Sequence, residues 1–356
     1  MATMRAGLRA QGLGPAAIDL VLRSRRQSTN RLYDLRWTTW FNYCEEHGID
    51  PTHPSVSQFA DFLTYLHSVK ELTAITIAGY RTVISTTVAI TRGVNHPSFA
   101  SSVVITQLIN GFKHAAPLRR SLCPKWDVTV VLTFLRERCE PLHSLTIKVL
   151  TYKTVFLLAL ATARRVSGLH AISGLPDDVV FARHNSSVTL AFLPEFRAKN
   201  QSVTELSQPF TIPGLRPLLC SDDTDIALCP VRCLKAYLAR TKASRHGKRR
   251  LLVSINQKYP RDIQKGSVSR WLRALIRLAY DESSASLPPC PIRAHETRAI
   301  SSSLAVATGA PLTSVLRAGY WKRQTTFLNF YLRDLAVHRL DNSSAIGPAV
   351  FAGHVA

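Results

Sequence analysis

The sequence predicts a mainly α-helical protein of two domains, the second of which contains one small antiparallel sheet. Its 356 residues suit two domains, because a single domain usually spans roughly 100–200 residues. Apolar residues recur at helical spacing through the first third of the chain, where no convincing strand occurs. Three short strand-like segments then interrupt a second, longer series of helices.

The first domain is expected to be an all-α bundle over residues 28–116, after a flexible lead over residues 1–27. The segment HGIDPTHP ends its first helix, because a glycine and two prolines break helical periodicity. The helices of this bundle are expected to begin near Ser28, Ser55, Thr73 and Ser102. The aromatic side chains expected to form its core are Trp37, Trp40, Phe59 and Phe62.

The second domain is expected to open with a short helix and a long apolar helix from about Leu145 through Ile172. The strand-like segments VVFA, VTLAFL and QPFTI follow, and the turn residues between them favour an antiparallel sheet. Helices then return, the last one around Phe327 to Leu335, with Phe327 and Phe330 expected in the core. The remaining boundaries are a basic linker at 117–126, the second domain at 127–340 and a tail at 341–356.

The charge of the chain points to a polyanionic partner. Lys and Arg number 45 against 23 Asp and Glu, a net charge of +22, and a charge of this size favours nucleic acid. No apolar run reaches the ~18 residues of a membrane span, and the N-terminus lacks a signal-peptide layout. The seven cysteines are odd in number and scattered, which suits a reducing, intracellular compartment.

Cofactor and metal sites are not expected. Cys229 and Cys233 lie four residues apart, but no histidine pair follows at zinc spacing. The chain also lacks a phosphate-binding glycine pattern and a carboxylate cluster suited to two-metal nuclease chemistry.

Three separated segments carry the strongest chemical signal. The first is ARRVSGL, residues 163–169, and the second is the quartet His295-Glu296-Thr297-Arg298. The third is AGYW, residues 318–321, which ends ten residues before Tyr331. Each is weak alone, but their order and spacing in a basic chain make the combination specific.

These segments resemble the boxes of the tyrosine recombinase/integrase family, most closely the recombinases of DIRS-like retrotransposons. LTYKTVFLLALATARRVSGLHAI is similar to the first-arginine box, and AGYWKRQTTFLNFYLRDL is similar to the tyrosine box. The resemblance covers nearly the whole chain and implies a SAM-like core-binding domain and a catalytic domain that close on double-stranded DNA as a C-shaped clamp. It also implies a homotetramer, a dimer of dimers on paired DNA sites, that integrates a mobile element in the nucleus or elsewhere inside the cell.

The resemblance assigns a role to each matched residue. Arg165 and Arg298 bind the scissile phosphate, because arginine stays cationic and grips two phosphate oxygens at once. Tyr331 is the nucleophile that forms a 3′-phosphotyrosyl link. A phenol with an ordinary pKa of about 10 needs a base or a strong positive field, and His295 is the base or proton relay.

Two more residues complete the implied catalytic set. Lys199, in FRAKNQ between two strand-like segments, protonates the leaving 5′-oxygen. The Trp321 indole N–H donates to the scissile phosphate. The full set is Arg165, Lys199, His295, Arg298, Trp321 and Tyr331.

Several alternatives remain open at this stage. Arg164 competes with Arg165, Arg197 with Lys199 and Tyr320 with Trp321. The family usually carries an acidic residue three positions after the first arginine, where this chain has Gly168. Two other functions therefore compete with the recombinase: a catalytically impaired DNA-binding protein and a type IB topoisomerase-like nickase.

Overall fold

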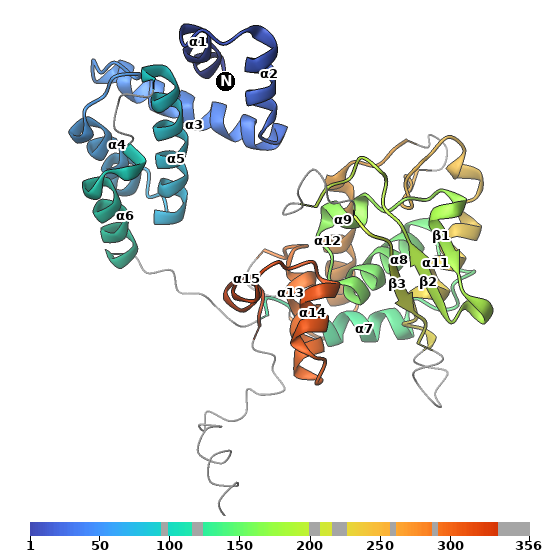
Figure 1. Cartoon of the computed structure of the whole chain (residues 1–356). Helices are drawn as coiled ribbons and strands as arrows, with labels where there is room; N and C mark the ends of the chain where they lie inside the picture. The colour runs from blue at the N-terminus through green and yellow to red at the C-terminus, as the bar shows by residue number, and fades with distance from the viewer. Residues whose placement is uncertain are drawn as a thin grey trace, which may run out of the picture. The chain divides into compact units, whose positions relative to one another are not determined.

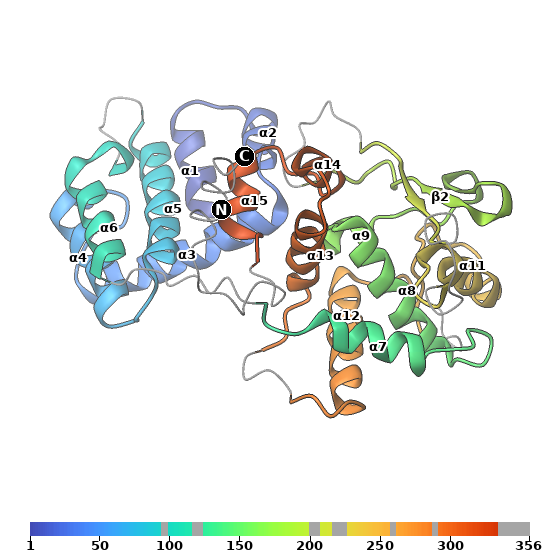
Figure 2. The same cartoon turned by 90° about the horizontal axis from the view of Figure 1, so that it is seen from below.

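The chain divides into two compact units, Met1–Arg120 and Ser121–Ala356, and the division falls inside the segment expected as the linker. The computed structural model describes residues 1–93, 99–115, 124–198, 207–215, 226–256, 261–286 and 291–333. The linker arginines Arg119 and Arg120 and the tail at 341–356 lie outside these residues. Figures 1 and 2 show the two units, each of which is described by itself.

The first unit is helical throughout its described part (Figure 1). Its elements are α1 (Ala2–Ala10), α2 (Pro15–Arg23), α3 (Gln27–Glu46), α4 (Val56–Ser68), α5 (Ala74–Arg92), the 3-10 turn η1 (Phe99–Ser101) and α6 (Val103–Ala115). Ser55 caps α4 in a capping box: its hydroxyl accepts from the backbone N–H of Gln58, and its own N–H donates to the Gln58 side chain.

The expected aromatic core of this bundle is confirmed. Trp37, Trp40, Phe59 and Phe62 are all buried, and the Trp40 ring centroid lies 4.9 Å from that of Phe62. Leu35, which also lies on α3, is 64% exposed, so not every apolar residue of this helix joins the core.

The expectation of a flexible lead over residues 1–27 is wrong, because this segment contains the helices α1 and α2. Their apolar residues Met4, Leu8, Ile18 and Leu22 are buried together, with Ile90 of α5 packed against them. Gly7 lets α1 approach α5 closely, because an added Cβ there would lie 3.0 Å from the Ile90 carbonyl oxygen. Short amphipathic helices gain most of their stability from such packing, which the local sequence does not reveal.

The second unit combines helices with a three-stranded sheet, as predicted. Its elements up to the sheet are α7 (Val128–Glu137), α8 (Ile147–Thr162), α9 (Val166–His170), η2 (Pro176–Asp178), β1 (Val179–Phe181), η3 (Arg183–Asn185), β2 (Ser187–Leu190) and β3 (Phe210–Pro213). Those after it are α11 (Pro230–Arg240), η4 (Ala243–Arg245), α12 (Lys265–Asp281), α13 (Glu296–Ala307), α14 (Leu312–Ala318) and α15 (Gln324–Phe330).

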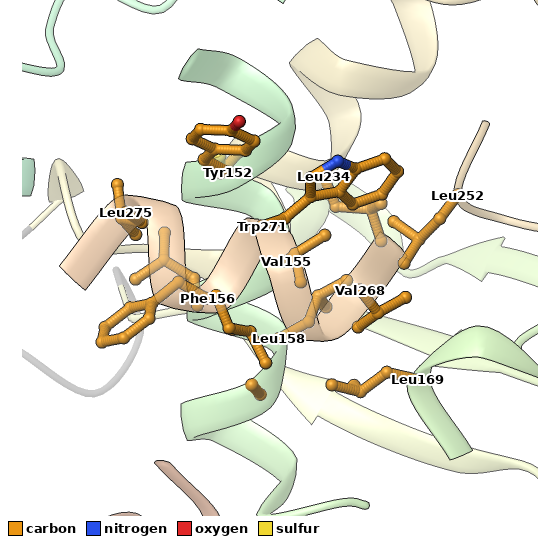
Figure 3. Close-up of a cluster of buried hydrophobic side chains, with 14 of the residues drawn as sticks. Tyr152, Val155, Phe156, Leu158, Leu169, Leu234, Leu252, Val268, Trp271 and Leu275 are labelled. Carbon is orange, nitrogen blue, oxygen red and sulfur yellow. The ribbon is translucent and has the colours of Figure 1, made fainter. Parts of the chain in front are cut away.

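The sheet is antiparallel in the order β1-β2-β3, and Val188 of β2 pairs with Ile212 of β3. Helix α8 is the central helix of this unit and is buried along most of its length. Figure 3 shows its side chains Val155, Phe156 and Leu158 packed against residues of α11 and α12. Figure 2 shows α7 beside α12, which it contacts.

Two boundaries in this unit differ from the expectation. Trp126, assigned to the linker, is 3% exposed and belongs to the core of the second unit. The long apolar helix is not continuous, because Ala163 takes a left-handed conformation with φ 46° and separates α8 from α9. In the described part of the chain, no helix is both long and apolar enough to cross a membrane.

Candidate active site

The break between α8 and α9 presents two consecutive arginines to different surroundings. After Ala163, Arg165 is extended with φ −67° and ψ 152° and is the N-cap of α9. The Ala163 carbonyl, freed from the helix by the break, accepts a hydrogen bond from Arg298 of α13 at 2.5 Å. The predicted arginine box therefore lies at a helix junction and not on a continuous helix.

Arg164 packs into a group of aromatic rings. Its guanidinium carbon lies 3.8 Å from the ring centroid of Phe210, 4.6 Å from Tyr320 and 4.8 Å from Phe192. Burial lowers the pKa of Arg164 to about 10. These stacking contacts give Arg164 a packing role at the base of the β2–β3 connection.

Arg165 lies among the predicted site residues instead. Its charge lowers the pKa of both His295 and Arg298, whereas the charge of Arg164 has a smaller effect on the pKa of Arg298. Within the described residues its side chain has no hydrogen bond or ion pair, so its donors are available to a ligand. The geometry thus favours Arg165 over Arg164 as a phosphate-binding residue.

Arg298 is 2% exposed and is fixed by backbone carbonyls rather than by a carboxylate. Besides its bond to Ala163, its second terminal nitrogen donates to the Gly319 carbonyl at 2.6 Å. Its guanidinium carbon lies 3.7 Å from the Trp321 ring centroid. Burial, and then the positive charge of Arg165, lower the pKa of Arg298 to about 9.

Tyr331 and His295 are in direct contact. The phenol oxygen of Tyr331 lies 3.1 Å from Nε2 of His295, which is a hydrogen bond. The pKa of His295 is lowered, first because neighbouring groups exclude water from the ring and then because of the charges of Arg298 and Arg165. A neutral imidazole beside a phenol can accept its proton when the phenol oxygen reacts.

The last helix ends earlier than expected. Helix α15 stops at Phe330, and Tyr331 follows it as the C-cap, 8% exposed. Phe327 is buried as expected, but Phe330 is 63% exposed, so its assignment to the core is wrong. Phe330 is the last residue of the seven-residue helix α15, and among the described residues it joins none of the buried clusters.

Trp321 contacts both Arg298, whose guanidinium lies over its ring, and Tyr331, whose ring meets it edge to face. Its ring centroid lies 5.0 Å from that of Tyr331, and its indole N–H is buried with no hydrogen-bond partner among the described residues. Gly319 is required next to it, because an added Cβ would lie 1.7 Å from Cζ3 of Trp321. Tyr320, the rival, turns toward Arg164, so Trp321 is the residue that joins the cluster.

Lys199 lies outside the described residues, and its role stays a prediction. Arg197, its rival, donates to the carbonyls of Pro194 and Phe196 at 2.6 and 2.9 Å. Ala198, the residue before Lys199, lines a cavity of about 690 Å³. Residues with cationic or aromatic side chains that line the same cavity are Arg164, Arg165, Phe210, Arg317, Tyr320, Trp321 and Lys322.

Gly168 is buried in α9, where the family's acidic residue would stand. An added Cβ would meet only the Arg164 side chain at ordinary contact distances, the nearest atom at 3.7 Å. The site has room for a Cβ atom, so crowding at this position does not explain why residue 168 is a glycine. A different carboxylate, Glu296, acts on His295, whose pKa it raises against the effect of the arginines.

The sequence interpretation missed the residues that hold Tyr331 to α13. Glu296 forms a buried ion pair with Arg333, with Nε to Oε1 at 2.6 Å and Nη2 to Oε2 at 3.2 Å. Ser303 accepts from the Arg333 backbone N–H at 2.8 Å and donates to the Tyr331 carbonyl at 3.3 Å. These contacts join residues 28 to 37 positions apart, which no local pattern signals.

Known proteins match this chain through their solved structures. No protein-family model matches the chain, and no curated protein is similar to it in sequence. The fold is that of tyrosine recombinases and integrases.

Three solved structures illustrate this match. The Tn1549 transposon integrase in complex with transposon right end DNA has a TM-score of 0.56 and 12% identity, over 95% of this chain and 97% of that one. A lambda integrase dimer bound to a COC′ core site has a TM-score of 0.53 and 17% identity, over 92% and 77%. A lambda integrase tetramer bound to a Holliday junction has a TM-score of 0.53 and 16% identity, also over 92% and 77%.

Proposed function

We propose that the chain is a DNA recombinase that breaks and rejoins strands through a covalent 3′-phosphotyrosyl intermediate. The observation that carries this proposal is the 3.1 Å contact between Tyr331 and His295, formed beside Arg165 and the buried Arg298. The recombinase fold and the net charge of +22 support DNA as the substrate.

The cleavage step follows from these groups. The Tyr331 phenol oxygen attacks the scissile phosphorus and gives its proton to neutral His295. Arg165 and Arg298 bind the non-bridging oxygens as negative charge builds there, and Trp321 supplies an additional N–H. The bond to the 5′-oxygen breaks, and Lys199 protonates that oxygen as it leaves.

Rejoining is the reverse reaction with a different strand. A 5′-hydroxyl gives its proton to Lys199 and attacks the phosphotyrosyl phosphorus, the bond to Tyr331 breaks, and the phenol recovers its proton from His295. The covalent link conserves the energy of the phosphodiester, so the exchange needs no ATP.

The finer parts of the proposal concern the biological setting. We infer a homotetramer on paired DNA sites, in a C-shaped clamp about the duplex, which acts in the nucleus to integrate a retrotransposon. Support comes from the motif resemblance and from the lambda integrase tetramer, whose fold this chain shares. A DNA-binding protein without cleavage activity is the second candidate, and Gly168 is the residue that favours it.

Covalent trapping tests the function directly. Duplexes of randomised sequence that the full chain retains are nicked and incubated with the unaltered protein and with Tyr331→Phe. We expect a protein–DNA adduct only with the unaltered protein, and equal retention of intact duplex by both.

An adduct of equal yield with Tyr331→Phe would remove Tyr331 as the nucleophile. Salt-sensitive retention without any adduct from the unaltered protein would favour the DNA-binding candidate. Relaxation of arbitrary supercoiled DNA without paired sites would favour a topoisomerase-like nickase.

A further inference from the structure

The chain around Tyr331 is bound to α13 at three points. The Tyr331 carbonyl and the Arg333 N–H both bind the Ser303 hydroxyl, and the Arg333 side chain binds Glu296. The Arg333 and Glu296 side chains are only 13% and 7% exposed. The segment that carries Tyr331 is therefore held on both its backbone and its following side chain.

The same helix carries the partner of the tyrosine. Glu296 is the first residue of α13, and His295 is its N-cap. A contact that fixes Arg333 to Glu296 thus fixes Tyr331 relative to the residue next to Glu296, which is His295. Helix α13 acts as the common frame for the phenol and for the imidazole that faces it.

The ion pair also has a defined electrostatic effect. Glu296 raises the pKa of His295 and Arg333 lowers it, so the two charges oppose each other at the imidazole. The other groups that face this ring are Arg165, Arg298 and Tyr331. An arginine–carboxylate pair with two short contacts is rigid as well as strong.

We propose that the Glu296–Arg333 ion pair, together with Ser303, is a positioning device that holds the Tyr331 phenol against His295. This inference rests on the proposed function for its effect on cleavage. The first-arginine box of this chain has Gly168 where the family usually has an acidic residue. The proposal gives Glu296 the task of a carboxylate that holds the site together. Glu296, Ser303 and Arg333 are positioning residues, since none of them has to touch the DNA.

Adduct formation is the first test. The nicked duplexes retained by the full chain are incubated with Glu296→Gln, Arg333→Gln and the double variant E296Q/R333Q. We expect the adduct rate to fall roughly 10- to 100-fold in each single variant, because small displacements of a reacting group have effects of this size. The adduct rate of the double variant should fall no further than that of the more impaired single variant, because all three variants remove the same interaction.

Arg232→Gln is the matched control. Arg232 makes a similar two-contact pair with Glu140, at 2.8 Å for both contacts, away from the site. We expect its adduct rate to stay within twofold of that of the unaltered protein. Losses in E296Q and R333Q no larger than the loss in R232Q would overturn the proposal.

Titration of His295 in the DNA-free protein is the second test, and it does not depend on cleavage. The imidazole signal that His295→Gln removes is followed by NMR across the pH range. Glu296→Gln should move its midpoint to lower pH and Arg333→Gln to higher pH, because the two charges act on the ring with opposite sign. Movement in the same direction, or none relative to R232Q, would overturn the proposal.

The two tests separate the two claims. Opposite movements of the His295 midpoint, with no adduct even from the unaltered protein, would support the positioning device and refute the recombinase. An adduct from the unaltered protein that E296Q and R333Q leave unchanged would refute the positioning device and retain the recombinase.

Discussion

Lys153 and Arg298 are both buried cations of the second unit, yet they are bound in opposite ways. Lys153 is fully buried and donates to the carbonyls of Leu135 and Cys139 at 3.0 and 2.8 Å and to the Glu140 carboxylate at 2.7 Å. Arg298 binds backbone carbonyls and has no carboxylate partner among the described residues.

This difference in partners indicates that the charge of Lys153 stabilises the fold, whereas the charge of Arg298 is available to a ligand. A buried cation with a carboxylate is neutralised, and its removal leaves the carboxylate without that compensation. Arg298 instead faces a second cation, Arg165, and its Nε has no hydrogen-bond partner among the described residues. Two adjacent cations without a counter-ion oppose stability but suit a site that receives an anion.

The largest effect on stability is expected from Lys153→Met. The change leaves two carbonyls without their donor and Glu140 with Arg232 as its remaining cationic partner. We expect the free energy of unfolding of the second unit to fall by about 3 kcal/mol, measured by denaturant unfolding. The exposed Lys148→Met on the same helix should change it by less than about 0.5 kcal/mol.

Arg298→Met is expected to affect DNA cleavage more than stability. Loss of one preorganised donor to a developing oxyanion lowers rates by on the order of 100- to 1000-fold, and we expect the adduct rate to fall by that factor. The stability loss should be smaller than in Lys153→Met, because the change also removes an uncompensated buried charge. A stability loss equal to that of Lys153→Met with cleavage intact would contradict the comparison.

The smallest expected effect is a dependence of stability on pH at His295. Its folded pKa lies below the ordinary value of about 6.5, so the unfolded chain takes up the proton first as the pH falls. The contribution of His295 is present above about pH 6.5 and is lost as the pH falls toward the lower, folded pKa. Denaturant unfolding of the unaltered protein and of His295→Gln at several pH values measures this.

The difference between the two proteins isolates His295 from other titrating groups. We expect the stability of the unaltered protein relative to His295→Gln to decrease as the pH falls through this window. A constant difference across the window would show that the histidine is not held in its neutral form.

Much of the fold could be predicted from periodicity. The buried tryptophans of α3, the apolar helix α8 and the three strands follow from the spacing of apolar and turn residues. Periodicity did not predict the features that depend on contacts between distant segments. It did not reveal α1 and α2, which are stable against α5, or the break at Ala163, where a carbonyl binds Arg298.

The candidate site could be predicted in part for the same reason. The resemblance of three segments to the tyrosine recombinase/integrase family singled out Arg165, His295, Arg298, Trp321 and Tyr331, and the structure brings these five together. The open choice between Arg164 and Arg165 needed the aromatic rings around Arg164.

Residue types and their spacing alone specified a basic, mainly helical chain, and its motif resemblance placed two arginines, a histidine and a tyrosine in the order of the recombinase family. The backbone break at Ala163 and the Glu296–Arg333 pair became visible only in three dimensions. Local sequence encodes helix spacing and charge, because these depend on neighbours within a few residues. The environment of a buried charge depends on groups more than a hundred residues away, as the Arg298 contact to Ala163 illustrates.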